Sequence, residues 1–416
     1  MRLQLLFGLL VLLVTTSGMT APEWGFFAHR RLNRLAVFTL DAEMMPFFRA
    51  NLEWITDHAV DPDKRRYATR HEAVRHYIDI DHWGESEPNY AHVPRRWTDA
   101  LLWKAELVFV PTARDTQVWA VDTITHPSPE QRFVPDSRVL LKNQEGQELE
   151  IQLGAYRGFW IRNVLPLYYE DNIYLSADSV RAVGFPIPAE GGGKLYIREN
   201  FSGYGILPYH LEQMHQRITQ AFIDEDASRI LRFCAEMGHY VGDAHVPLHT
   251  TENYNGQLTG QTGIHAFWES RIPELFADAD YDFFVGKAEY IENPREYYWD
   301  IVLKSHSLVD SVLRTEQRLR DTYPVDQQMC FDERLGRTVR TQCAEFAAAW
   351  DAEMQGMVEE RFRATILSIG SVWYSCWVDA GQPDLTRLAP RPEIYAGSDT
   401  LDRAVQGGQI KGRIHE

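Results

Sequence analysis

Apolar residues recur every three or four positions in the first and last parts of the chain, and this spacing predicts helices there. Within residues 24–103, Leu32, Leu35, Ala36 and Leu40 share one face of such a helix. From Gly203 onward the spacing returns, and further helical patterns lie between about residues 294 and 377. The two most regular helices have apolar faces at Leu207, Leu211, Met214, Ile218 and Phe222, and at Ile230, Phe233, Met237 and Val241.

The segment 105–201 has a different pattern. It contains short runs such as ELVFV, QVWAVDTI, SRVLL and ELEIQL, which are rich in β-branched and aromatic residues. Clusters of Pro, Gly, Asn and Asp separate the runs, as is typical of turns between strands. Three consecutive glycines at 191–193 form a flexible connector near its end. The sequence therefore predicts a small β-rich unit inserted into a helical protein.

The expected fold class is mainly α, with a discontinuous helical domain at 22–104 and 202–383 and the β-rich insertion at 105–201. A polar tail follows at 384–416. The chain has 416 residues, of which 44% are hydrophobic, so it can bury a large core.

Residues 1–21 have the layout of a secretory signal peptide: an early arginine, an apolar run from Leu5 to Val14, and then small residues. A retained membrane anchor is the alternative interpretation. No later apolar run approaches the roughly 18 residues needed to span a bilayer, so we expect no transmembrane segment in the mature chain. A secreted or periplasmic location is the prediction.

Export places the four cysteines in an oxidising compartment, where they allow two disulfides in three connectivities. They are Cys234, Cys330, Cys343 and Cys376, and the pair 330 and 343 is the most local possibility. None of them forms a CxxC motif, which favours structural cysteines over a thiolate metal site.

The formal net charge is −17, from 59 acidic and 42 basic residues. Such a surface repels polyanions at long range, so we expect no binding to duplex DNA. A local basic or metal-lined cleft would still allow a polyanion to bind despite the negative net charge.

The most informative stretch is HYVGDAHVPLHT, residues 239–250. His239 and Asp243 lie four residues apart on one helix face, and Pro247 then ends the helix before His249. The motif HAFWE places His265 and Glu269 at the same spacing. A single histidine on an apolar face is usually a core residue. Burying several imidazoles and carboxylates together is costly unless a cation satisfies them, and this donor set without thiolate suits zinc.

These motifs resemble the signature of the zinc-dependent phospholipase C and single-strand-specific nuclease superfamily, whose members are helical and hold three zinc ions in a cleft. Upstream, WGFFAH resembles the family's N-terminal tryptophan and histidine, and DPDKR with RHYIDID resembles its aspartate and histidine pair. The resemblance covers both helical zones and leaves the β-rich segment unmatched.

The resemblance implies a ligand set for each zinc ion. One ion is assigned to Asp61, His76, His239 and Asp243, a second to His249, His265 and Glu269, and a third to Trp24, His29 and Asp243, which bridges two metals. Asp61 fits the family spacing to His76 best, and Asp57 and Asp63 are the alternatives. Asp61 is also a candidate base that orients the attacking water. Lys64 is a candidate for neutralising a phosphate oxygen, or else a solvated surface charge.

The chain departs from the family in two places. The family's tryptophan begins the mature chain, whereas here Glu23 precedes Trp24 and Pro22 disfavours cleavage just after Ala21. The nucleases carry an arginine three residues after the first aspartate and an asparagine after the last carboxylate ligand, where this chain has Lys64 and Ser270. The presence of Lys64 and Ser270 at these positions makes the chain resemble the phospholipases more than the nucleases.

The expected function is a secreted zinc-dependent phosphodiester hydrolase, phospholipase C-like, that uses a metal-activated water. Its substrate is a phosphodiester, either a phospholipid head group or single-stranded nucleic acid. The alternatives are a single-strand-preferring nuclease of the same superfamily and a secreted zinc-binding protein without turnover.

Overall fold

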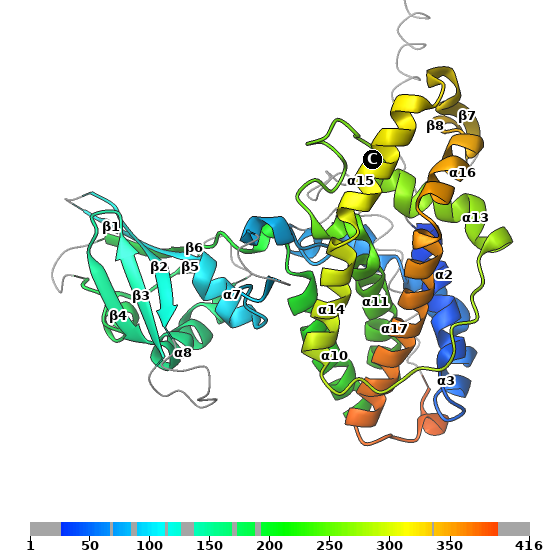
Figure 1. Ribbon diagram of the computed structural model, residues 1–416. Coiled ribbons are helices and arrows are strands. Elements are labelled where there is room, and N and C mark those ends of the chain that lie inside the picture. The colour runs from blue at the N-terminus through cyan, green and yellow to red at the C-terminus, as the bar shows by residue number, and fades with distance from the viewer. Residues whose placement is uncertain are drawn as a thin grey trace, which may run out of the picture.

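A computed structural model describes residues 26–66, 70–84, 90–112, 115–125, 137–168, 173–187, 193–334 and 337–389. The predicted signal peptide, Trp24 and nearly all of the predicted tail lie outside the described residues. The chain forms a helical unit and a smaller sheet-containing unit beside it (Figure 1).

The helical unit is built around α11 (Ala227–His245), which packs against α10 (Leu207–Ile223), α17 (Met357–Asp379), α2 (Phe26–Ala36) and α14 (Pro294–His306) (Figure 1). Helix α11 begins where the Asp226 carboxylate accepts a hydrogen bond from the Arg229 backbone N–H. Its apolar face is fully enclosed, and its C-terminal half is buried on all sides. Polar side chains in that half therefore need partners inside the protein.

The remaining α-helices have at most 14 residues. They are α3 (Met45–Ala50), α4 (Leu52–His58), α5 (Asp61–Arg66), α6 (Arg70–Ala73), α7 (Trp97–Lys104), α8 (Leu153–Asn163), α9 (Ala177–Arg181), α12 (Ile264–Ala266), α13 (Ile272–Asp280), α15 (Val309–Thr322) and α16 (Ala344–Glu353).

The smaller unit contains a six-stranded antiparallel sheet of order β4-β3-β2-β1-β6-β5. Its strands are β1 (Glu106–Pro111), β2 (Gln117–Thr125), β3 (Arg138–Asn143), β4 (Glu148–Gln152), β5 (Ile173–Tyr174) and β6 (Gly193–Arg198). Helix α8 follows β4 directly and contributes buried aromatic side chains to the core. Helices α8 and α9 were not expected inside the β-rich segment.

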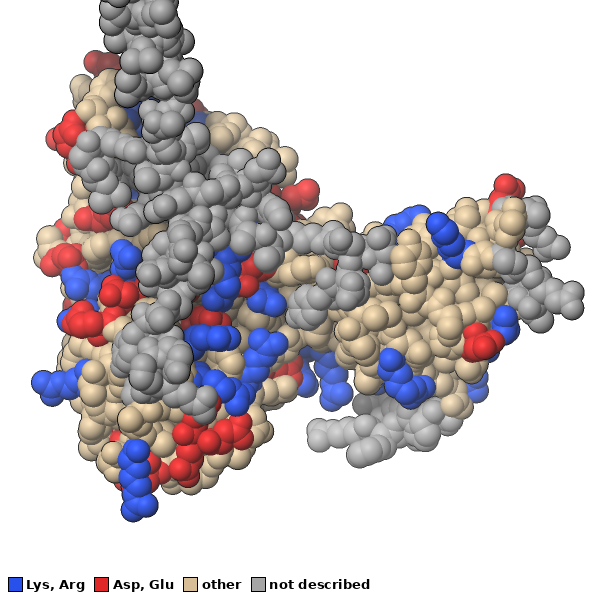
Figure 2. Space-filling model, turned by 180° about the vertical axis from the view of Figure 1, so that it is seen from behind, with Lys and Arg blue, Asp and Glu red and all other residues tan. Residues whose placement is uncertain are grey.

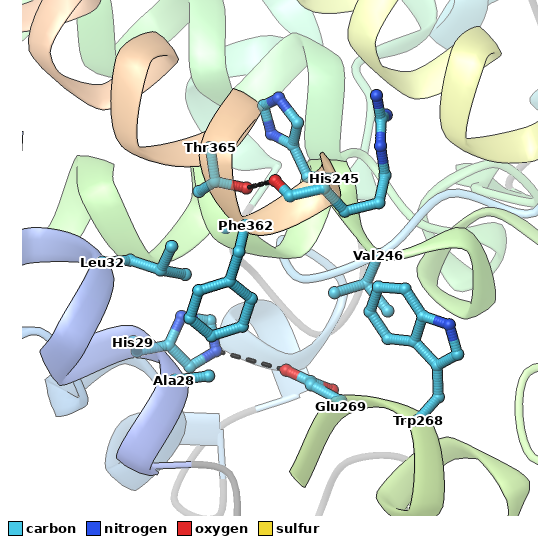
Figure 3. A pocket seen from close by; sticks show the side chains of 11 residues that line it. Ala28, His29, Leu32, His245, Val246, Trp268, Glu269, Phe362 and Thr365 are labelled. Atoms are coloured by element: carbon cyan, nitrogen blue, oxygen red, sulfur yellow. Dashed lines mark hydrogen bonds and ion pairs between the residues drawn. The ribbon is translucent and has the colours of Figure 1, made fainter. Parts of the chain in front are cut away.

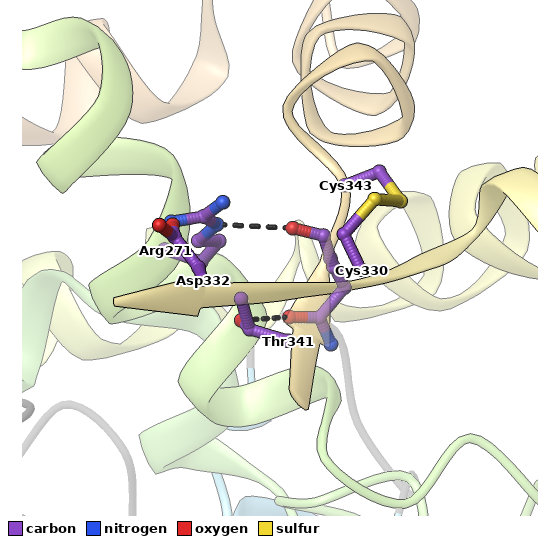
Figure 4. Close-up of a disulfide and its surroundings, with 6 residues drawn as sticks. Arg271, Cys330, Asp332, Thr341 and Cys343 are labelled. Carbon is purple, nitrogen blue, oxygen red and sulfur yellow. Dashed lines mark hydrogen bonds and ion pairs between the residues drawn. A yellow bond between two sulfur atoms is a disulfide. The ribbon is translucent and has the colours of Figure 1, made fainter. Parts of the chain in front are cut away.

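A second unexpected element is the hairpin of β7 (Met329–Arg334) and β8 (Arg337–Gln342), which interrupts the helical region. The Cys330–Cys343 disulfide closes it (Figure 4). Cys234 and Cys376 are buried and free, so the structure has one of the two disulfides that the cysteine count allows. The hairpin sequence is polar and exposed, and the disulfide supplies cross-linking where there is little apolar burial.

The molecule is thus mainly helical with a small antiparallel sheet, as the sequence predicts at that level. Within the described residues, every helix is too short or too polar to cross a membrane.

Candidate metal centre

Eight acidic and histidine side chains converge inside the helical unit. They form four overlapping groups, and the ligand atoms of each group lie within 4.8 Å of one another. The eight residues are His29, Asp63, His76, His239, Asp243, His249, His265 and Glu269. All are buried except Glu269, which is nearly so. These groups could hold a metal ion.

Asp243 lies at the centre of the cluster, and its two oxygen atoms face different partners. Oδ2 lies 2.9 Å from His76 Nδ1 and 3.4 Å from His239 Nε2. Oδ1 lies 3.5 Å from His29 Nε2 and 3.9 Å from His249 Nε2. Oδ2 therefore faces two members of the predicted first ligand set, and Oδ1 faces His29 of the third set and His249 of the second.

Backbone carbonyl groups fix the orientation of three imidazoles. The Nδ1 atoms of His239, His249 and His265 lie 2.9, 2.5 and 3.0 Å from the carbonyl oxygens of Ala59, His76 and Tyr254. A carbonyl oxygen can only accept, so each Nδ1 carries the proton and each Nε2 keeps a lone pair directed at the cluster. This arrangement is typical of metal-binding histidines.

The second group depends on a π-helical turn, η7 (Phe267–Arg271), between α12 and α13. Such turns occur often at functional sites. His265 and Glu269 lie four residues apart across it, with His265 Nε2 2.8 Å from Glu269 Oε2. His249 Nε2 lies 3.4 Å from the same oxygen. The three predicted ligands of this group therefore meet.

The disulfide-closed hairpin supports this turn. Arg271, the last residue of η7, forms an ion pair of 2.9 Å with Asp332 and donates from Nε to the Gln342 carbonyl oxygen (Figure 4). The hairpin thus anchors the turn two residues beyond Glu269.

The structure places Asp63, one of the two alternatives, in the cluster in place of Asp61, and the other alternative, Asp57, is exposed. Asp63 Oδ1 lies 3.7 Å from His239 Nε2 and 3.9 Å from His76 Nδ1. Asp61 and Asp63 are two residues apart in α5, about 200° around the helix axis, so only one of them can face the cluster. Asp61 Oδ1 instead lies 3.4 Å from Lys64 Nζ. The catalytic roles expected for Asp61 and Lys64 stay predictions.

His29 reaches the cluster because α2 packs closely on α11. Its ring stacks on His239 with 3.8 Å between centroids, and its Nε2 lies 3.4 Å from Glu269 Oε1. A Cβ atom on Gly238 would overlap the side chain of Asn33, and one on Gly242 would lie 3.0 Å from His29 Nδ1. The two glycines of α11 therefore permit this helix contact.

The pKa shifts within the cluster suit a bound cation. Burial, together with the charges of Asp63 and Glu269, raises the pKa of Asp243 well above its usual value. Burial lowers the pKa of His76 and of His239 well below the usual value. Burial also opposes ionisation of Glu269, but the imidazoles of His249, His265 and His29 beside it outweigh burial and lower the pKa of this carboxyl. A bound cation would offset the cost of burying these carboxylates.

Sequence reasoning missed a polar network behind the cluster. Glu72 accepts hydrogen bonds from the Tyr240 hydroxyl and from Arg75, and Arg65 pairs with Glu236 at 2.8 Å. Tyr240 packs edge-on against His76 at 5.4 Å between centroids. Only the density of charge in residues 64–75 signals the network in the sequence.

In comparisons with known proteins, no protein-family model, no curated protein and no solved structure matches this chain. The case for a metal centre therefore depends on the residues and their geometry.

The two aspartates of α5 provide a matched test. Asp63→Asn is expected to lower the affinity for divalent metal at least tenfold, because it removes a charged donor from the cluster. Asp61→Asn serves as the control and should bind metal like the wild type. Metal content after dialysis, measured by mass spectrometry, distinguishes the two; the opposite order would show that Asp61 is the ligand.

The glycine contact gives a second prediction. Gly238→Ala should lower the free energy of unfolding by about 1–3 kcal/mol and weaken metal binding, because the added methyl group forces α2 and His29 away. Gly154→Ala in α8 is the control, since a Cβ there meets nothing within 4 Å. Urea unfolding of both variants is the measurement. Equal stability of the two variants would contradict this role of Gly238.

His245 predicts a pH dependence of stability. Burial, assisted by the charge of Arg361, lowers its pKa to about 3. In the unfolded chain His245 is protonated below about pH 6.5, whereas in the folded chain it stays neutral down to about pH 3. Lowering the pH from about 6.5 to 3 should therefore lower the free energy of unfolding. In chelator, His245→Gln should make the slope of unfolding free energy against pH shallower by about 1.4 kcal/mol per unit. Equal slopes for the wild type and His245→Gln would show that His245 does not cause the loss of stability in acid.

Proposed function

We propose that this protein is a zinc-dependent phosphodiester hydrolase, phospholipase C-like. The carrying observation is that Asp243 offers one oxygen to His76 and His239 and the other to His29 and His249. A carboxylate between two ligand sets suits adjacent metal ions, which is the arrangement of two-metal phosphoester hydrolases.

The donor chemistry supports zinc among the divalent metals. Five imidazoles and three carboxylates contribute, and the two free cysteines lie outside these groups. Imidazole suits zinc and other transition metals, whereas calcium and magnesium prefer oxygen donors alone. Two zinc ions are proposed for the described residues, and a third site involving His29 would also need Trp24.

Bound zinc would supply Lewis acidity toward a phosphoryl oxygen and would acidify water near neutral pH. The protein's own residues prepare the site for that chemistry. Backbone carbonyl groups hold the Nδ1 atoms of histidines 239, 249 and 265, so the Nε2 atoms face the cluster. Glu269 remains ionised, since its pKa lies well below the usual value. The burial of the cluster excludes bulk water, which strengthens each electrostatic interaction.

One observation favours the nuclease alternative. With Asp63 in the cluster, the residue three positions later is Arg66, whose Nη1 lies 3.2 Å from Asp63 Oδ1. The aspartate and arginine spacing of the nucleases is thereby restored, although Ser270 still departs from them. Lys and Arg side chains also gather on the helical unit, in the half nearer the sheet (Figure 2). The net charge of −17 is thus unevenly spread and does not exclude a single-stranded polyanion.

A secreted zinc-binding protein without turnover is a different class of explanation. It requires closed, fully ligated sites, whereas an enzyme leaves a position for water or substrate. Spectroscopy of the cobalt-substituted protein distinguishes the two, because an open site changes its absorption when phosphate is added.

The activity itself is tested with two substrates side by side. The purified zinc-loaded protein is expected to hydrolyse a choline phospholipid faster than single-stranded DNA, and chelator should abolish the turnover. Faster cleavage of DNA would assign the nuclease function. Turnover of neither substrate, nor of a small phosphodiester, with zinc bound would contradict the proposed activity.

Removing one ligand of the second group tests the link between metal and turnover. His249→Leu is expected to lose zinc from that group and to lower kcat at least a hundredfold, since Glu269 and His265 alone hold the ion weakly. His92→Leu is the control, because His92 is a half-buried histidine outside the metal-binding groups. Full activity of His249→Leu would show that this histidine is no ligand.

A further inference from the structure

The π-helical turn η7 carries a candidate metal ligand at its centre and a buried arginine at its end. The Glu269 carboxylate points to His29, and Trp268 extends from the same turn (Figure 3). Arg271 closes the turn two residues farther along the chain, and its side chain is only 8% exposed. The position of the Glu269 carboxylate is therefore tied to the place where the Arg271 guanidinium is held.

Both hydrogen-bond partners of Arg271 within the described residues lie on the hairpin of β7 and β8. Nη1 forms the 2.9 Å ion pair with Asp332 of β7, and Nε donates to the Gln342 carbonyl oxygen of β8 at 3.1 Å (Figure 4). A buried guanidinium without its partners is energetically costly, so Arg271 would move toward water if the two strands separated. That movement would displace η7, and Glu269 with it.

The hairpin has little apolar burial to keep its strands together. Phe331, the largest apolar side chain of β7, is 77% exposed. A two-stranded hairpin without further support is marginally stable in water. Here the Cys330–Cys343 disulfide joins β7 to the residue that follows β8. The disulfide constrains the unfolded chain and thereby stabilises the hairpin.

The two cysteines of this disulfide differ in exposure. Cys330 is an exposed residue, whereas Cys343 is buried at the start of α16. A thiolate can therefore attack the sulfur atom of Cys330, and Cys343 leaves as a thiolate that takes up a proton. A second thiol of the reductant then releases Cys330. The protein gains two thiols, and two thiols of the reductant are oxidised to one disulfide.

Other supports of the metal centre do not pass through the hairpin strands. Phe267, the first residue of η7, packs on Phe346 and Trp350 of α16, with ring centroids 5.6 and 4.3 Å away. The ligands His239 and Asp243 belong to α11, at the centre of the helical unit. Loss of the disulfide should therefore loosen the end of η7 while the helical core and the ligands on α11 stay in place.

We propose that Arg271 is a positioning residue for Glu269 and that the Cys330–Cys343 disulfide controls it. In the oxidised chain the hairpin holds η7, and the ligand group that contains Glu269 binds its metal ion tightly. Reduction frees the hairpin, releases Arg271 and weakens the binding of that ion. The inference rests on the metal-binding part of the proposed function and is independent of the substrate.

The zinc affinity of the oxidised and the reduced protein tests the inference. The reductant is a phosphine, which carries no thiol to bind zinc. Competition with a chromophoric chelator should show that reduction lowers the affinity for one of the two ions about 10- to 100-fold, as for other partners that orient a metal ligand. The double variant Cys330→Ser and Cys343→Ser should behave like the reduced wild type, and reductant should change nothing further in it. Affinity that is independent of the redox state overturns the inference.

Variants that keep the disulfide separate the ion pair from general destabilisation. Asp332→Asn should weaken the same ion in the oxidised protein, and reduction should then add little, because both changes release Arg271. Asp326→Asn is the matched control, since Asp326 is exposed just before β7 and is not a partner of Arg271. Arg271→Lys, which keeps the charge, should lose less affinity than Arg271→Gln. Equal affinity of Asp332→Asn and Asp326→Asn overturns the inference even if the reduced chain unfolds.

Hydrogen exchange in the presence of chelator gives a readout that needs neither metal nor turnover. Reduction should speed amide exchange in residues 264–272 and leave α11 protected. This pattern in a protein that hydrolyses no phosphodiester would support the inference while the proposed activity fails. Unchanged exchange of residues 264–272 on reduction would overturn the inference and leave the proposed activity intact.

Discussion

The burial of the Asp243 and Glu269 carboxylates among histidines is the constraint on which the rest of the structure depends. Taking carboxylates out of water costs several kcal/mol each unless an opposite charge accompanies them. Here Asp243 lies beside His76 and His239, whose pKa values burial lowers well below the usual value, so these rings supply little positive charge and a bound cation would supply it. The surrounding helices can be understood as a scaffold that makes this burial possible.

Several local features of these helices position the side chains of the cluster. Gly238 and Gly242 let α2 approach α11, backbone carbonyl groups orient three imidazoles, and the π-helical turn presents Glu269. A disulfide-closed hairpin then holds the turn from outside through Arg271. Because each support comes from a different element, the candidate metal centre is coupled to the packing of the helical unit.

Much of the site could be predicted from spacing alone. The pairs His239 with Asp243 and His265 with Glu269 are one helical turn apart, and Pro247 marks the chain reversal that returns His249. The choice between Asp61 and Asp63 could not be made, because it depends on how α5 is rotated against α11. Helix α8 was missed because its aromatic residues resemble those of strands, and the hairpin because its polar residues show no apolar alternation. The support that Arg271 gives to Glu269 arises only from tertiary contacts.

The most direct test of the central claim is the zinc stoichiometry of the purified chain at equilibrium, measured by mass spectrometry for the wild type and Asp243→Ala. The account predicts at least two zinc ions per wild-type chain. It also predicts that both are weakened together in Asp243→Ala, since one carboxylate serves both ligand sets. A wild-type chain that binds no zinc, or an Asp243→Ala chain that binds as much as the wild type, would contradict it.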